Sequence, residues 1–187
     1  MTRVILAVSG SSGAGKTRLI EALAHARPDA LRLHFDDYVS LGNDVAEIKA
    51  WLAAGADPDA IRSPRLAKDL AKLARAPLVI LEEPFGKARR EIAGFVTHAV
   101  HIEVPPEVAL ARRLLRAIRD EFEPGDPALV ASLEGQLAAF LAIGREAYAA
   151  ADRAARSCAD LIVDGLQPSG TIAAAVLAAI EIAGEKP

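Results

Sequence analysis

The sequence predicts an α/β fold in which a five-stranded parallel sheet is covered by helices on both faces. Three observations favour this fold class. Five short apolar runs alternate with helix-prone segments along the 187 residues. One of these runs, residues 78–81, is apolar without interruption, which is typical of a parallel strand that is buried on both faces. A glycine-rich segment at residues 10–17 stands between the first apolar run and the first helix-prone segment.

The elements follow one another without a repeat, a low-complexity run or a linker, so we expect residues 1–187 to form one domain. Prolines set several boundaries: Pro28 follows the first helix, Pro64 begins a later one after the N-cap residue Ser63, and Pro105 precedes a long one. The expected strands are 3–8, 31–35, 78–81, 99–104 and 161–163. The expected helices are 16–26, 44–54, 64–76, 107–122, 128–155 and one that follows Ser169.

The composition is typical of a compact protein with a full core, since hydrophobic residues make up 52% of the chain. The net charge of −3 gives no general attraction to nucleic acid or to anionic membranes. A single cysteine, Cys158, excludes an internal disulfide and a multi-cysteine zinc site. The N-terminus lacks a signal-peptide pattern, and the apolar stretch 172–183 is too short to cross a bilayer. We therefore expect a cytoplasmic protein without a membrane segment or nucleic-acid partner; its oligomeric state stays open.

Residues 10–17 match the phosphate-loop pattern G-x-x-x-x-G-K-[ST] at every position. In such a loop successive backbone N–H groups bind phosphate oxygens, and the following helix adds its positive N-terminal end. We expect Lys16 to reach the β- and γ-phosphates and the Thr17 hydroxyl to bind Mg²⁺. ATP is the expected nucleotide because no base-reading motif of the GTPase type is present, although GTP is left open. The residues expected to hold ATP are Gly10, Ser11, Ser12, Gly13, Ala14, Gly15, Lys16 and Thr17.

Two carboxylates, Asp36 and Asp37, stand where the second expected strand ends. The carboxyl ends of parallel strands share one edge of the sheet, so these acids are expected near the phosphate loop. An acid there accepts the proton of an attacking hydroxyl group or helps to hold Mg²⁺. Asp36 is expected to be this catalytic base because it is nearer the strand end, with Asp37 as the alternative. Asp37 and Tyr38 are also expected to contact the acceptor.

Glu82 continues the apolar run 78–81, which is the arrangement of the acid at the end of a Walker-B strand. Such an acid holds Mg²⁺, usually through water, or orients a nucleophile. The expected metal site therefore consists of Thr17, Asp36 and Glu82.

Four arginines lie within eight residues of one expected helix, and three of them, Arg112, Arg116 and Arg119, share a face. Guanidinium groups on one face repel one another unless an anion is present, and a triphosphate is a suitable anion. We expect Arg112 and Arg113 to bind the nucleotide and Arg116 to act catalytically by stabilising charge on the transferred phosphoryl group.

A break at residues 123–127 follows this helix and contains two prolines and a glycine. It is a plausible hinge, so residues 107–127 are expected to form a lid that closes over the site and excludes water.

The ordered set of motifs resembles the uridine kinase and nicotinamide riboside kinase group of P-loop kinases. The resemblance extends from residue 3 to about residue 180 and is carried by residues 10–17, 35–38, 79–82, 110–116 and 159–165. It implies ATP, Mg²⁺ and phosphorylation of a hydroxyl of a small molecule such as a nucleoside. It also implies that Asp36 is the base and that Glu82 is a metal-site acid. Asp57 is similarly placed to the acid with which this group grips the ribose diol.

Other readings stay open from the residues. The acceptor could instead be pantothenate, a sugar or another alcohol. A nucleotide monophosphate kinase needs additional arginines for the acceptor's phosphate, and Arg62, Arg65, Arg89 and Arg90 are candidates for that role. A regulatory P-loop ATPase acting as a switch is a third possibility, although neither a partner surface nor a water-positioning residue is evident in the sequence.

Overall fold

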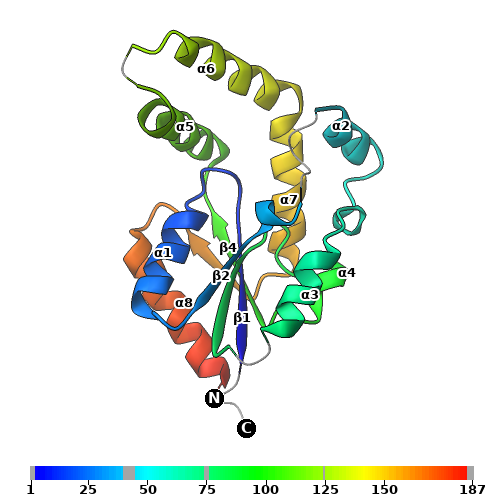
Figure 1. Ribbon diagram of the computed structural model, residues 1–187, viewed down its shortest axis with the longest axis vertical. Coiled ribbons are helices and arrows are strands. Elements are labelled where there is room, and N and C mark those ends of the chain that lie inside the picture. Colours follow the sequence, from blue (N-terminus) through cyan, green and yellow to red (C-terminus); the bar gives the residue numbers. More distant parts are fainter. Residues whose placement is uncertain (1–2, 40–44, 74–75, 124, 185–187) are drawn as a thin grey trace.

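The computed structural model describes residues 3–39, 45–73, 76–123 and 125–184. Its centre is a five-stranded sheet in the order β2-β3-β1-β4-β5 (Figure 1). All neighbouring strands run parallel, which confirms the predicted fold class. The strands are β1 (Val4–Ser9), β2 (Leu31–His34), β3 (Leu78–Glu82), β4 (His98–Glu103) and β5 (Leu161–Asp164).

Except for the short α4, the helices follow the predicted order. They are α1 (Lys16–Ala26), α2 (Val45–Ala53), α3 (Pro64–Lys72), α4 (Arg90–Ala93), α5 (Pro106–Arg116), α6 (Ala128–Ala139), α7 (Arg145–Ser157) and α8 (Ser169–Gly184). Single turns complete the chain: η1 (Phe35–Asp37), η2 (Pro58–Ala60), and the wide turns η3 (Ala117–Glu121) and η4 (Phe140–Gly144).

The boundaries differ from the expected ones in a few places. The second strand ends at His34 because Phe35 turns inward as a buried residue and begins η1. The expected helix 128–155 continues to Ser157 through η4. The sequence does not predict η2 or α4, which are too short to show a helical period. The expected start at Asp44, the expected helical end at 74–76 and the break residue Pro124 fall wholly or partly outside the described residues.

The two faces of the sheet bury different helices. Alternate residues of β1 point to opposite faces: Leu6 and Val8 pack with α1 and α8, whereas Ile5 and Ala7 pack with α3 and α4. Figure 1 shows these two helical layers on either side of the strands. The strands are therefore held on both faces, and their carboxyl ends remain free to build a site.

A third apolar cluster joins η1 to helices that lie far from it in the sequence. Phe35 meets Phe85 edge to face, with ring centroids 6.2 Å apart, and Trp51 of α2 meets Phe85 at 5.9 Å. Ala150 of α7 belongs to the same cluster. Aromatic packing of this kind fixes the position of η1 relative to α7.

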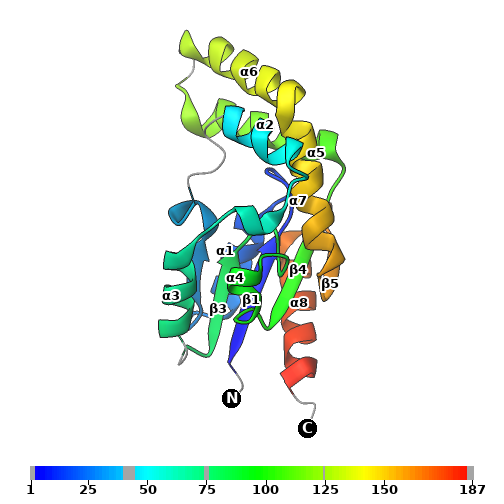
Figure 2. The same cartoon turned by 90° about the vertical axis from the view of Figure 1, so that its right-hand side faces the viewer.

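Beyond the carboxyl edge, α5 and α6 stand away from the sheet (Figures 1 and 2), and we call residues 106–139 the arm. The arm exposes apolar side chains, among them Leu115 and Val130. Within the described residues, one helix, Ala128–Ser157, is long and apolar enough to cross a membrane by length and composition alone. Within this helix, 6% of the apolar 18-residue stretch that meets this criterion is buried. Its later part packs on the domain through Ala150 and Ala155.

The topology opens a crevice at the carboxyl edge. The chain that leaves β1 forms α1 on one face of the sheet and the chain that leaves β3 forms α4 on the other face, although β1 and β3 are neighbours. Connections that diverge in this way leave room between them, which is where ligands bind in open α/β sheets. The phosphate-loop pattern follows β1 directly at this point.

Candidate active site

The phosphate loop connects β1 to α1 in a conformation that its glycines permit. Gly13 has φ +93°, and a Cβ atom at this residue would lie 2.1 Å from the carbonyl oxygen of Ala109 in α5. Gly15 has φ +108° and precedes the first turn of α1. Side chains at either position would be strained, and one at Gly13 would also collide with the α5 backbone. The loop is thus built against the base of the arm.

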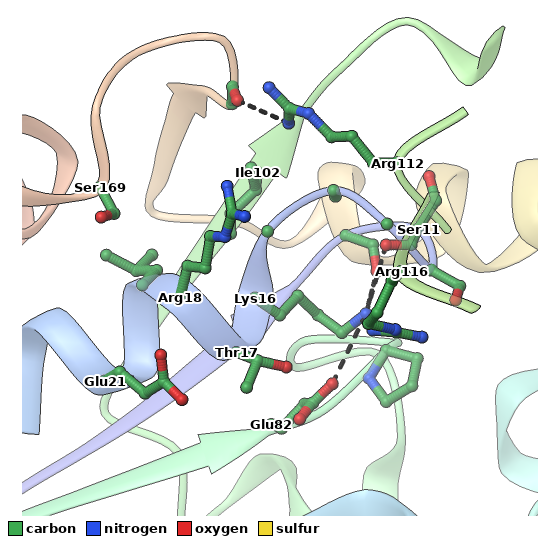
Figure 3. A pocket seen from close by; sticks show the side chains of 18 of the residues that line it. Ser11, Lys16, Thr17, Arg18, Glu21, Glu82, Ile102, Arg112, Arg116 and Ser169 are labelled. Carbon is green, nitrogen blue, oxygen red and sulfur yellow. Dashed lines mark hydrogen bonds and ion pairs between the residues drawn. The ribbon is translucent and has the colours of Figure 1, made fainter. Parts of the chain in front are cut away.

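The Lys16 side chain lies inside the loop and contacts its backbone. Its Nζ atom donates hydrogen bonds to the carbonyl oxygens of Gly10 at 2.9 Å and Ser11 at 3.3 Å, and it lies 3.6 Å from Oε1 of Glu82 (Figure 3). Burial lowers the pKa of Lys16, and the nearby Glu82 carboxylate opposes this shift. The side chain is therefore held in the centre of the loop, as expected of a lysine that contacts phosphate.

Thr17 and Glu82 lie close to Lys16 and point toward the same space in Figure 3. The second carboxylate oxygen of Glu82 is 3.0 Å from Nδ1 of His34, which fixes the carboxylate between two groups. The described residues contain no group of three or more His, Cys, Asp or Glu side chains that could hold a metal ion by themselves. A hydroxyl and one or two carboxylates fit Mg²⁺, which usually binds through a few protein oxygens, water and substrate phosphates.

Asp36 is an exposed residue of η1 and lines the same cavity as the loop. Its carboxylate makes no hydrogen bond within the described part of the chain, but its charge acts on Lys16. Asp37 and Tyr38 also line the cavity. The Tyr38 hydroxyl donates to Asp69 at 3.3 Å, and the Arg65 guanidinium lies 4.8 Å from the centre of the Tyr38 ring. The structure thus places all three expected residues beside the loop.

The arginines of α5 and η3 separate into two groups. Arg112, Arg116 and Arg119 line the cavity, and Nη1 of Arg112 donates to the carbonyl oxygen of Gly165 at 2.9 Å. Arg113 instead faces the helices behind the loop, where its Nη1 donates to the Tyr148 hydroxyl at 2.8 Å. The structure therefore brings Arg112 and Arg116 to the cavity as expected, but it does not bring Arg113 there.

Asp57 also lies outside the cavity. Its carboxylate accepts a hydrogen bond from the backbone N–H of Asp59 at 2.9 Å, and its carbonyl oxygen accepts one from Nε1 of Trp51 at 2.9 Å. It is thus the N-cap of η2 and an anchor for α2. An Asp directly before a proline is a common turn-starting residue, so local structure rather than ligand binding accounts for Asp57.

A buried ion pair supports η1 from beneath. Glu83 and Arg89 have fully buried side chains, with Oε1 and Nε 3.9 Å apart. The Arg89 guanidinium also lies 5.3 Å from the centre of the Phe35 ring and donates to the Ser63 hydroxyl. Burial raises the pKa of Glu83 to about 7, although the positive charge of Arg89 acts in the opposite direction. The pair holds Phe35, and with it the neighbouring Asp36.

One cavity of about 1600 Å³ joins the phosphate loop, Glu82, η1 and the arginines Arg112, Arg116 and Arg119. At one end it is lined by Arg18 of α1 and by the segment Gly165–Ser169 that follows β5; at the other it is lined by η1 and by Asp152 of α7. The volume exceeds the 300–1,000 Å³ that is usual for a site holding one small ligand. The cavity therefore has room for two ligands, with the phosphate loop between its ends.

Sequence reasoning misses several charged residues of this cavity, among them Arg18 and Asp152. Arg18 directly follows the motif and would have been found by extending the motif by one residue. Asp152 has no local signal, because it is one acid among several on a long helix; only the fold brings it to Ser11, whose hydroxyl donates to its Oδ2 at 2.7 Å.

No family model and no curated protein matches this chain. Solved structures do. A sugar kinase from a Janibacter species is 18% identical, with 97% of this chain and 96% of that chain covered and a TM-score of 0.55. Shikimate kinase from Aquifex aeolicus is 18% identical, with 97% and 99% covered and a TM-score of 0.50. The chain therefore shares the α/β fold of these two kinases.

Proposed function

We propose that this chain is an ATP-dependent kinase that transfers the γ-phosphoryl group to a hydroxyl group of a small molecule. The observation that carries the proposal is the continuity of one cavity, which runs from the phosphate loop to the Asp36 carboxylate. A nucleotide-binding switch needs room for a nucleotide and water only. A kinase needs a second subsite on the far side of the transferred group, with a proton acceptor in it.

In this reaction the phosphates of ATP bind to the backbone N–H groups of the loop, with Lys16 along the β- and γ-phosphates. The acceptor oxygen forms a bond to the γ-phosphorus while the bond between that phosphorus and the β–γ bridging oxygen breaks. Asp36 accepts the hydroxyl proton, and ADP leaves. Arg116 and Lys16 stabilise the charge that spreads over the transferred group.

Thr17 and Glu82 would hold Mg²⁺, and Asp36 would contribute from the side of the metal that faces the acceptor. A bound Mg²⁺ neutralises charge on the β- and γ-phosphates and helps to align them. The His34 contact keeps the Glu82 carboxylate oriented toward this position.

The finer proposal is that the acceptor is a nucleoside. It is supported by the ordered motifs, by Asp36 and Tyr38 on one wall of the cavity, and by an aromatic residue, Phe35, among the lining side chains. A nucleotide monophosphate as acceptor has less support, because the cavity lining described here includes none of Arg62, Arg65, Arg89 and Arg90.

The test is acceptor-dependent production of ADP from ATP and Mg²⁺. Purified protein is assayed with a panel of nucleosides, nucleoside monophosphates, sugars and pantothenate, each against an acceptor-free control. A kinase releases ADP many times faster with the right acceptor than without it. Equal ADP release with and without every acceptor, at a rate above the enzyme-free blank, would indicate an ATPase instead.

A further inference from the structure

The charged side chains at the end of the cavity that η1 and α7 line are all negative. We call the lining residues of η1, the β3 end and α7 the acceptor wall. Its charged members are all acidic: Asp36, Asp37, Glu82 and Asp152. The cations that line the cavity come from the loop, α1 and the arm. The segment 40–44, which lies outside the described residues, contains no Lys or Arg in its sequence.

The nearby arginines that would recognise an anionic acceptor are paired elsewhere. Arg62 pairs with Glu91 at 3.5 Å, and Arg90 pairs with Asp59. Arg65 donates to the carbonyl oxygen of Asp37 from behind Tyr38, and Arg89 is fully buried. None of the four lines the cavity. An acceptor with a carboxylate or phosphate would thus meet carboxylates with no compensating cation on this wall, which is unfavourable.

Asp152 differs from the other acids of this wall because it comes from the helix α7 and contacts the phosphate loop. It reaches the start of the phosphate loop, where the Ser11 hydroxyl donates to its Oδ2 at 2.7 Å. That bond leaves the other carboxylate oxygen, Oδ1, free of any hydrogen bond within the described residues. Its charge also acts on Lys16, as does that of Asp36. Asp36 and Asp152 therefore approach the same centre from two elements, η1 and α7.

We propose that Asp152 binds the hydroxyl or amino groups of the acceptor, and that the acceptor is a polyhydroxylated molecule that is uncharged or cationic. Hydroxyl and ammonium groups donate hydrogen bonds, and a carboxylate accepts them with added strength from its charge. In this arrangement Asp36 takes the proton of the reacting hydroxyl, while Asp152 fixes the neighbouring donors. The inference rests on the proposed kinase function and narrows its acceptor class.

The first test compares Asp152→Asn with Glu146→Gln, a matched loss of one exposed carboxylate on the same helix outside the cavity. Asparagine keeps the size and still accepts from Ser11, so thermal unfolding should stay close to that of the wild type. Asp152→Asn is expected to raise the KM for the acceptor about 10-fold or more, with a small change in kcat and in the KM for ATP. Glu146→Gln should leave all three near wild type.

Ser11→Ala separates acceptor binding from an effect through the loop. It removes the hydrogen bond to Asp152 but keeps the carboxylate. If Asp152 binds the acceptor, Ser11→Ala changes the KM for ATP at most, whereas Asp152→Asn changes the KM for the acceptor. Equal effects of both variants on the KM for ATP, with no change for the acceptor, would overturn the proposal and leave Asp152 as a loop-positioning residue.

The second test uses acceptor sets that share a skeleton and all hydroxyl groups: a nucleoside with and without a carboxylate on its base, and a sugar glycoside whose aglycone is neutral, carboxylated or amino-substituted. The neutral and amino members are expected to have kcat/KM at least about 10-fold above the anionic members. A preference for an anionic member would overturn the inference, while its acceptor-dependent turnover would still support kinase function. If none of the acceptors supported turnover, both this inference and the proposed kinase function would be overturned.

Discussion

The phosphate loop and the acceptor wall of the cavity are built in different ways. The phosphate loop is one short segment, residues 10–17. The acceptor wall is assembled from η1, the β3 end and α7, and Asp36 and Asp152 are separated by more than a hundred residues. Phosphate is the same in every nucleotide, so one compact loop can bind it, whereas an acceptor of particular shape needs walls from several elements.

This difference implies that substitutions in the phosphate loop act on every acceptor alike, while the effects of substitutions on the acceptor wall depend on the acceptor. The predictions below test that division, from the largest expected effect to the smallest.

Lys16→Ala should have the largest effect. It removes the cation that we propose contacts the β- and γ-phosphates, so kcat/KM is expected to fall about 1,000-fold or more with every acceptor. Steady-state kinetics and titration with an ATP analogue measure transfer and binding separately. Circular dichroism serves as the control for folding. A folded variant with normal turnover would contradict the assignment of the loop.

Asp36→Asn should come second. The amide keeps the size of the side chain but cannot accept the hydroxyl proton, so kcat should fall about 100-fold or more while ATP binding changes by a few-fold at most. Asp37→Asn is the matched control on the adjacent residue. If Asp37→Asn has the large effect and Asp36→Asn does not, the base has been assigned to the wrong carboxylate.

Arg116→Ala should follow, with a loss of about 10-fold in kcat that exceeds its effect on the KM for ATP. The reason is that the charge on the transferred group changes most in the transition state. Arg113→Ala is the comparison, three residues earlier on the same helix. It removes the contacts of Arg113 to Tyr148 and Phe140 and should mainly lower the melting temperature. Larger kinetic losses at Arg113 than at Arg116 would contradict the division of the α5 arginines.

The smallest effect is expected in the pH dependence of stability. His101 is buried behind the phosphate loop, 3.1 Å from the Ser9 hydroxyl, and burial lowers its pKa from the usual 6.5. Below pH 6.5 the unfolded chain binds a proton that the folded chain resists, so this residue's contribution to stability is lost as the pH falls through that range. Denaturant titrations at pH 7.5 and 5.5 should show a smaller loss for His101→Asn than for the wild type. Equal losses would remove His101 as the cause.

The accuracy of sequence-based prediction follows the same division. Gly10–Thr17, Asp36 and Glu82 could be placed in advance because each stands at the end of a recognisable strand, and parallel strands bring such ends together. Asp57 resembled a ligand in sequence but caps a turn, since an Asp–Pro pair satisfies its own backbone. Arg113 directly follows Arg112 and therefore points about 100° away around the helix. Which of these two faces meets the cavity depends on how α5 packs, and the sequence alone does not show that packing.

Asp152 could not be predicted because its position depends on three separate structural features. The helix α7 must cross the carboxyl edge, the cluster of Phe35, Phe85 and Ala150 must hold it there, and Ser11 must lie within hydrogen-bond reach. None of these features leaves a local pattern around residue 152. The same holds for Arg89, whose burial beneath Phe35 removes it from the set of arginines available to an acceptor.

The most direct test of the central claim is ³¹P nuclear magnetic resonance of the complete reaction. The wild-type protein is incubated with ATP, Mg²⁺ and the best acceptor of the panel, and all phosphorus products are followed together. A kinase with two ligands in one cavity predicts a phosphate monoester of the acceptor formed one to one with ADP, with little inorganic phosphate. ADP accompanied only by inorganic phosphate, at a rate independent of the acceptor, would contradict the account.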